Sequence, residues 1–463
     1  MSFISVKTQI LLFVACLTFV LLNHNHFFIF DNIIQIAIPA NLYYKDNFTY
    51  YFLPDSLATG HPTFVAYYVA IMWKVFDRNL WITHLAFLPF IYGICYQLLY
   101  FIKKLGLLKL HTSLIFITVI LDVTLLCQLS IITFDIIQLF FFLWSINLII
   151  NKKKWFLMLA FTGLILTSMR GALCAGGVLL FDILYNFNIN NKPNLKRYLF
   201  YIPGIASAIA FYLCFYLDKH WIIHNTVSNN WPTTGEIAGP IKFLLNIASF
   251  AWQLINYGRL VIYLILVYIL YKMIANKTLF NQQFKTIVLV ALSQFLVFFP
   301  LVVYKSLLAP KYLLPIIIFV TIASLYWVFT YAKQPKLLYT LLIICTFAGY
   351  LNPSIHQSWD ATPAHWPYYN LRNQMLAYIV DKQIPFNSIG SFFPNLQSTY
   401  NTDLTSKEER FVEADSIKNK YIFYSNMYNE APPFKYLLFN SGKWIIEKEF
   451  SGGRVKVVLF KKK

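Results

Sequence analysis

The sequence predicts an α-helical polytopic membrane protein that carries a small α/β domain at its C-terminal end. Apolar residues make up 58% of the chain and charged residues only 12%, and the mean hydropathy is +0.57. Apolar runs of roughly 17–25 residues, each long enough for a transmembrane helix, recur along most of the chain. Near Pro353 these runs shorten and charged residues become frequent. We therefore expect a membrane part at residues 1–350 and a water-soluble part at residues 351–463.

The apolar runs predict about eleven membrane crossings. The first run, TQILLFVACLTFVLL, has no small-residue cleavage site after it, which favours a retained anchor over a signal peptide. The fifth and sixth runs are short, so we expect tilted or broken helices there. The expected spans are residues 8–30, 80–102, 112–130, 135–150, 155–169, 171–187, 197–217, 257–275, 283–301, 313–331 and 336–350.

Lysine clusters between the runs predict the orientation. With Lys7 inside, the lysine-rich short loops all fall on one side of the membrane, and positive short loops mark the cytoplasmic side. An odd number of crossings then places residues 351–463 outside, together with a long first outer loop at residues 31–79. We expect a protein of the cytoplasmic (inner) membrane. The same clusters account for the net charge of +19, so the charge does not indicate a nucleic-acid partner.

Local patterns predict the secondary structure outside the spans. In the outer loop, HPTFVAYYVAIMWKVF predicts an amphipathic helix along the membrane interface. In the soluble part, PYYNLRNQMLAYIVDK predicts a helix, while SIGSFF, YIFYSN, KWIIEKEF and RVKVVLF predict strands. The chain has no Gly-rich phosphate loop, so nucleotide hydrolysis has no support.

Asp31 is the first candidate for chemistry. It follows the first span, where a carboxylate is partly desolvated yet still reaches water, a position that suits a general base or a cation ligand. Position alone favours another interpretation equally, in which Asp31 caps a helix that begins at Asn32.

Other charged residues gather on the same predicted side. Asp135 opens the fourth span, Arg170 interrupts the fifth and sixth, and Lys305 and Lys311 precede the tenth. Charges in or beside spans are costly and are usually functional, and the positive-inside bias does not explain cations on the outer side. Arg170 and Lys311 suit phosphate binding, one through a planar fork and the other as a point charge. The alternative is an internal ion pair, such as Asp135 with Arg170.

The order of these features resembles the GT-C superfamily of polytopic glycosyltransferases. The resemblance is to the branch that uses polyprenyl-phosphate sugars and includes bacterial protein mannosyltransferases and the lipid A aminoarabinose transferase. The matching segments are FDN with Asp31, GHPTF with His61, the aspartate Asp135, SMRG with Arg170, and PKYLLP with Lys311 and Tyr312. The chain has Asn32, Thr63 and Lys311 where the family frequently has Glu, Pro and Arg. The missing second acid weakens the expectation of a metal ion, and the lysine lacks bidentate geometry.

The resemblance implies an inverting glycosyltransferase that moves a sugar from a polyprenyl-phosphate donor to an extracytoplasmic protein, lipid or glycan. Asp31 would be the general base and His61 would position the loop or the acceptor. Arg170, Lys311 and Tyr312 would bind the donor phosphate. Asp135 and Lys305 would support them. No cofactor is certain, and a divalent metal ion with unknown ligands remains possible.

An alternative function and the role of one segment stay open. A transporter or flippase of lipid-linked sugars also has many spans, but such proteins tend to carry broken helices in two repeated halves, and no such symmetry is visible in the sequence. The segment SWDATPAHW, with Asp360 and His365, follows the last span and either closes over the site or is a linker.

Overall fold

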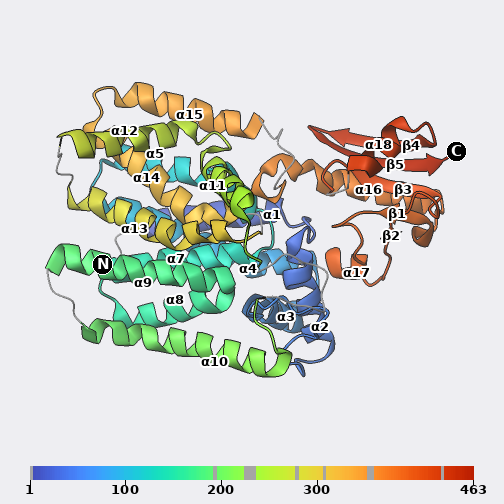
Figure 1. Cartoon of the computed structure of the whole chain (residues 1–463), viewed down its shortest axis with the longest axis horizontal. Helices are drawn as coiled ribbons and strands as arrows, with labels where there is room; N and C mark the ends of the chain where they lie inside the picture. The colour runs from blue at the N-terminus through green and yellow to red at the C-terminus, as the bar shows by residue number, and fades with distance from the viewer. Residues whose placement is uncertain are drawn as a thin grey trace.

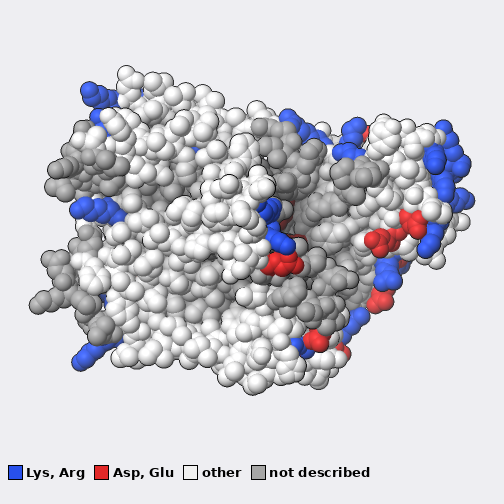
Figure 2. Space-filling view, viewed as in Figure 1, with Lys and Arg blue, Asp and Glu red and all other residues white. Residues whose placement is uncertain are grey.

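The protein consists of a helical body and a smaller α/β lobe that lies at one end of it (Figure 1). The computed structural model describes residues 4–190, 195–223, 236–276, 281–305, 309–351, 359–428 and 432–463. The middle of the body shows almost no charged side chains on the face in Figure 2, whereas lysines and arginines lie at its far end and on the lobe. This distribution is the one expected of a protein whose body lies in lipid.

Each of the expected spans contains a helix. Among the described residues, five helical segments are long and apolar enough to cross a membrane, or seven if each of two bent helix pairs is one span. The other apolar helices are shorter, so the count of eleven crossings stays a prediction. The helices are α1 (Val6–Leu22), α4 (Leu80–Lys104), α5 (Lys109–Ile120), α6 (Val123–Leu129), α7 (Phe134–Ile150), α8 (Lys154–Thr167), α9 (Met169–Asn190), η2 (Leu195–Tyr201), α10 (Ile202–Lys219), α12 (Leu260–Asn276), α13 (Gln282–Phe298), η3 (Phe299–Val303), η4 (Pro310–Leu313), α14 (Leu314–Tyr331) and α15 (Pro335–Leu351).

Two helix pairs are bent, and a buried ion pair joins their bends. The pair α5 and α6 bends by 69°, and α12 bends by 105° from α11 (Pro240–Ile255), a helix that the sequence analysis did not predict. The Asp122 carboxylate accepts the backbone N–H groups of Thr124 and Leu125 and so starts α6. Arg259, at the second bend, donates to both Asp122 oxygens over 2.7 and 2.8 Å. The two bends are therefore joined by one pair of charges.

The first outer loop folds into η1 (Ile33–Ala37), α2 (Ile38–Lys45) and α3 (Phe64–Phe76), at the end of the body nearest the lobe (Figure 1). The predicted amphipathic helix is present as α3. Its Trp73 is fully buried and donates its indole N–H to the Thr83 hydroxyl over 2.8 Å, whereas Val75 and Phe76 are exposed. The exposed apolar side chains suit the predicted interfacial position, which stays a prediction.

The lobe is built on a five-stranded sheet with the order β2-β1-β3-β5-β4, in which β1 is parallel to both neighbours and the other pairs are antiparallel. Buried side chains of α16, including Met375 and Ile379, pack against Val457 and Leu459 of β5. The predicted helix and four strands are all present, whereas β2, α17 and α18 were not predicted. The elements are α16 (Pro367–Asp381), β1 (Ile389–Ser391), α17 (Thr399–Thr402), β2 (Val412–Glu413), β3 (Tyr421–Ser425), α18 (Pro432–Asn440), β4 (Trp444–Gly452) and β5 (Val455–Lys462).

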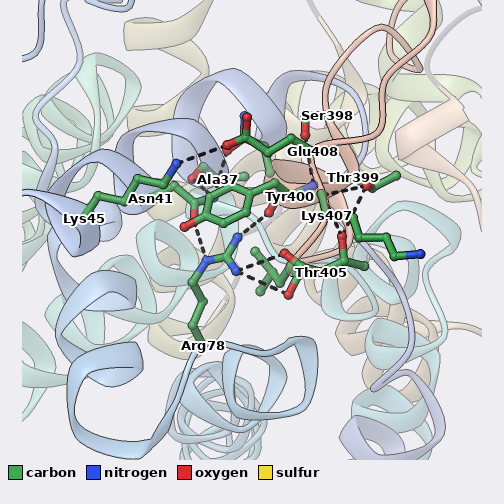
Figure 3. A network of polar contacts seen from close by, with 12 residues as sticks. Ala37, Asn41, Lys45, Arg78, Ser398, Thr399, Tyr400, Thr405, Lys407 and Glu408 are labelled. Atoms are coloured by element: carbon green, nitrogen blue, oxygen red, sulfur yellow. Dashed lines mark hydrogen bonds and ion pairs between the residues drawn. The ribbon is translucent and has the colours of Figure 1, made fainter. Parts of the chain in front are cut away.

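Arg78 connects the body to the lobe (Figure 3). Its guanidinium donates to the Asn41 side chain over 2.6 Å and to the carbonyls of Tyr400, Leu404 and Thr405 in the lobe. It also lies 3.7 Å from the centre of the Tyr400 ring, a cation–π distance. The planar guanidinium of Arg78, with its several N–H donors, thereby holds the segment from Tyr400 to Thr405 of the lobe against the outer loop.

The predicted orientation has a direct test at an exposed position of the lobe. A cysteine at Ser406, which is exposed, should react with an impermeant thiol reagent in intact cells whose outer barrier has been permeabilised. The background should lack Cys214 and Cys345, because the other four cysteines are buried. Labelling that requires lysis of the cells would place the lobe in the cytoplasm.

Candidate functional site

Asp31 lies at the first helical turn after α1, and its carboxylate faces a buried lysine. An oxygen of Asp31 lies 3.6 Å from Nζ of Lys311, whose side chain is only 4% exposed, whereas that of Asp31 is 23% exposed. Lys311 belongs to η4, directly before α14. Its ammonium also forms an ion pair with Asp360 of η5 (Trp359–Ala361). The ammonium group thus lies between two carboxylates, one just after the first helix of the body, α1, and the other just after its last helix, α15.

The environment of Asp31 makes it a better base than an ordinary aspartate. Burial raises the pKa of its carboxyl above the usual value, and the positive charge of Lys311 acts against this rise. The charge of Asp360 adds to the rise. A raised pKa brings a carboxylate closer to the range in which it accepts a proton efficiently at neutral pH. The carboxylate faces Lys311, so the interpretation of Asp31 as a helix cap is not needed to explain its position.

Arg170 is held mainly by aromatic rings. It lies in the first turn of α9, where its guanidinium carbon is 3.5 Å from the centre of the Tyr312 ring and 4.8 Å from that of Phe134. Its nearest acid is Asp135 at 3.7 Å, which is longer than a direct hydrogen bond. The ion pair with Asp135 is therefore present but loose. Within the described part of the chain, Nε of Arg170 has no hydrogen-bond partner, so the guanidinium has donors left for an anion.

His61 fixes the start of the helix that carries Arg170. Its Nδ1 accepts the backbone N–H of Met169 over 3.3 Å, so a neutral ring carries its proton on Nε2. Burial lowers the pKa of His61 to about 3, and the charge of Arg170 adds to the effect. The imidazole is therefore neutral at physiological pH and is a poor proton carrier there. It lies after Gly60, whose φ of +74° and contact with the Ile222 carbonyl leave no room for a side chain.

Tyr312, Asp135 and Lys305 complete the set that the sequence singled out. Tyr312 stacks on Arg170, and Asp135 lies near it, so both belong to the group around Asp31. Lys305 instead forms an exposed ion pair with Glu236 at 2.5 Å. The structure thus brings six of the seven predicted residues into one group and gives the seventh a different partner. Figure 2 shows acidic and basic residues close together on the surface where the body joins the lobe.

Asp360 is a residue that the sequence analysis noted but did not place among the candidate site residues. Its backbone carbonyl accepts hydrogen bonds from the Gln128 amide, over 2.5 Å, and from the Cys127 thiol, over 3.0 Å, both on α6. The segment SWDATPAHW was noted as one that either covers the site or links the domains, and it does bring a carboxylate to the site. Nothing in its local pattern shows that α6 would hold it there.

The donor set at Asp31 does not fit a divalent metal ion. The described residues include no group of three or more His, Cys, Asp or Glu that could hold one. The two acids that do converge, Asp31 and Asp360, have the ammonium of Lys311 between them. A cation supplied by the protein thus fills the place that a metal ion would take, and we derive no step through a metal.

The fold is similar to that of a known membrane protein. The crystal structure of ArnT from Cupriavidus metallidurans bound to undecaprenyl phosphate superimposes with a TM-score of 0.51 over 98% of both chains, at 12% sequence identity. No family model matches the chain, and neither does any curated protein. The structural match extends over the helical body and the lobe together, since it covers nearly all of each chain. The protein therefore has the GT-C-like polytopic membrane fold that the resemblance predicted.

Proposed function

We propose that the protein is a membrane glycosyltransferase that moves a sugar from a polyprenyl-phosphate donor to an acceptor outside the cytoplasm. The observation that carries the proposal is that Asp31, a partly exposed carboxylate, faces Lys311 and lies within electrostatic reach of Arg170. A base next to phosphate-binding groups is what displacement from a lipid phosphate requires. The undecaprenyl phosphate bound to the structurally similar ArnT supports the class of donor.

In the proposed reaction, Asp31 accepts the proton of an acceptor hydroxyl as its oxygen attacks the anomeric carbon. The bond between that carbon and the phosphate oxygen breaks on the opposite side, and the configuration is inverted. Arg170 donates to the phosphate as charge develops on it. Lys311 has three N–H donors, and only Asp360 accepts a hydrogen bond from it, so donors remain for the phosphate.

The other predicted residues have positioning roles in the proposal. His61 holds the first turn of α9 through Met169 and thereby orients Arg170. Tyr312 and Asp135 keep the guanidinium of Arg170 in place from two sides. We assign Lys305, which is exposed, a supporting role at the rim, where it could meet the donor headgroup before it enters.

The test is mass spectrometry of envelope glycolipids, glycans and glycoproteins from cells with and without the gene. Loss of one sugar residue from one product would support the proposal and identify the donor and acceptor classes. The purified protein should then restore that residue from the corresponding undecaprenyl-phosphate sugar. Movement of the lipid-linked sugar across vesicles without any transfer would instead indicate a flippase.

Arg170→Ala should weaken binding of undecaprenyl phosphate. Hydrogen bonds to a charged group are worth about 1.5–3 kcal/mol, which corresponds to about a 10- to 150-fold increase in Kd. Lys456→Ala is the matched control, because its side chain is 59% exposed on the lobe and its charge is screened by water. The affinity of each variant is measured by titrating the protein in detergent with undecaprenyl phosphate and following its fluorescence or the heat released. Equal affinities for a folded Arg170→Ala protein and the wild type would return Arg170 to a structural role.

A further inference from the structure

We propose that Asp360 is a positioning residue of this reaction, acting on Asp31 through the ammonium group of Lys311 that both carboxylates contact. The inference rests on the proposed function. It also makes the segment that leads into the lobe a part of the active site.

The geometry of the shared ammonium is unequal. Asp360 forms a close ion pair with Lys311 that is also a hydrogen bond, whereas Asp31 lies 3.6 Å from the same nitrogen. The lysine is therefore anchored by Asp360 and only approached by Asp31. Asp31 keeps a carboxylate that is not fully engaged, and a base needs this in order to accept a proton.

The place of Asp360 is set by the protein and does not depend on its own charge. Gln128 and Cys127 of α6 both donate to its carbonyl. A few residues on, the Trp366 indole N–H donates to the Ser130 hydroxyl over 2.9 Å. Two points of attachment to the same stretch of the body fix the segment between them. The carboxylate of Asp360 is thereby presented to Lys311 from a rigid support.

Removal of Asp360 would change the balance of charges around Asp31. Four charged groups act on it: Lys311 of η4, Asp360 of η5, Arg170 of α9 and Asp135 of α7. Asp360 raises the pKa of Asp31 and Lys311 lowers it. Without Asp360, the lysine has Asp31 as its remaining close acid. Both effects have the same sign, so the pKa of Asp31 must fall, and a weaker base accepts a proton less readily.

Infrared difference spectroscopy tests this without any substrate. The spectrum of the purified full-length protein minus that of Asp31→Asn, taken over a pH series, isolates the acid form of the Asp31 carboxyl. In the Asp360→Asn background the midpoint of this titration should move to lower pH. Asp403→Asn is the matched control, because it removes a carboxylate of the lobe that binds Arg372 over 2.8 and 3.1 Å. It should leave the midpoint of Asp31 in place. An unmoved midpoint in Asp360→Asn would overturn the inference.

A second measurement uses transfer of sugar from the undecaprenyl-phosphate donor identified above. Asp360→Asn should lower the rate by about 10- to 100-fold, the scale of a misplaced catalytic group, and should move the acidic limb of the pH–rate profile to lower pH. In a Lys311→Met background the same change should have a much smaller effect, because only the direct charge of Asp360 then acts on Asp31. If Asp360→Asn lowers the transfer rate by the same factor with and without Lys311, Asp360 does not act through Lys311.

Two more variants keep the inference testable if Asp360→Asn is unstable. Gln128→Leu leaves every charge in place and loosens only the support of Asp360, so it should give a smaller shift of the Asp31 midpoint in the same direction. Asp360→Glu retains the charge and should keep the midpoint near the wild-type position. An unshifted midpoint in Gln128→Leu would count against the inference. Failure of the proposed function is seen separately, as the absence of sugar transfer by the wild-type protein.

Discussion

Asp31→Asn should reduce sugar transfer by about 10²–10⁴-fold, the range typical of losing a general acid–base group. Asparagine is nearly isosteric with aspartate but takes no proton at neutral pH. Lys311 keeps Asp360 as its partner in the variant, so the buried ammonium is not left unpaired and the fold should survive. Binding of undecaprenyl phosphate should therefore be retained. The measurement is transfer by purified protein at matched concentration, together with lipid affinity.

The capping interpretation of Asp31 predicts the opposite pattern. Asn and Asp cap helices about equally well, so Asp31→Asn would be nearly neutral, and Asp31→Ala would cost about 1 kcal/mol of stability. Asp55→Asn is a matched control, since this acid also lies in the first outer loop but pairs with Lys219 at 3.1 Å, away from Lys311. Near-normal transfer by Asp31→Asn would remove Asp31 from the mechanism and leave Asp135 as the next candidate.

Asp122→Ala should destabilise the protein by about 3–5 kcal/mol, because it leaves the Arg259 guanidinium buried without its counter-charge. Arg259 is 1% exposed. The variant also removes the acceptor that starts α6. Because α6 carries Gln128, which supports Asp360, protein that remains folded should also lose transfer activity. Unfolding in detergent micelles by added dodecyl sulfate measures the change in stability.

Two comparisons distinguish the loss of stability caused by breaking the buried pair from a general effect of removing a charge. Glu449→Gln breaks a partly exposed pair with Lys456 and should cost less than about 1 kcal/mol. The double variant Asp122→Leu/Arg259→Met replaces both charges by apolar groups and should recover much of the lost stability, as is often found for buried ion pairs. An Asp122→Ala protein as stable as the Glu449→Gln protein would show that the pair does not hold the two bends.

The elements of the protein could be predicted well, but their lengths less so. The first expected span, residues 8–30, is helical only to Leu22, after which the Asn23 side-chain amide donates to the Phe19 carbonyl over 2.7 Å. Phe28 and Ile29 are buried among protein side chains. Hydropathy records only that a residue avoids water and does not distinguish burial in lipid from burial in protein.

Some residues of the candidate site could be predicted from the sequence, and others could not. The sequence indicated Asp31, Arg170 and Lys311, because charged side chains beside apolar spans are costly and need a reason to be there. Asp360 lies outside the spans, in a polar segment where an acid is unremarkable, so no local signal distinguished it. Its role depends on two hydrogen bonds from α6 to its backbone carbonyl. Lys305 carried the same local signal as Lys311, yet it pairs with Glu236.

The sequence by itself determined the solvent of each part of the chain, since the free energy of moving a segment from water to lipid depends on its own side chains. It thereby determined the helical class, the position of the lobe in the chain and the small set of costly charges. Only the tertiary structure decided which of those charges meet. Lys311 lies between Asp31 and Asp360, which are more than 300 positions apart along the chain. Such contacts depend on the summed packing of the whole body and not on any local pattern.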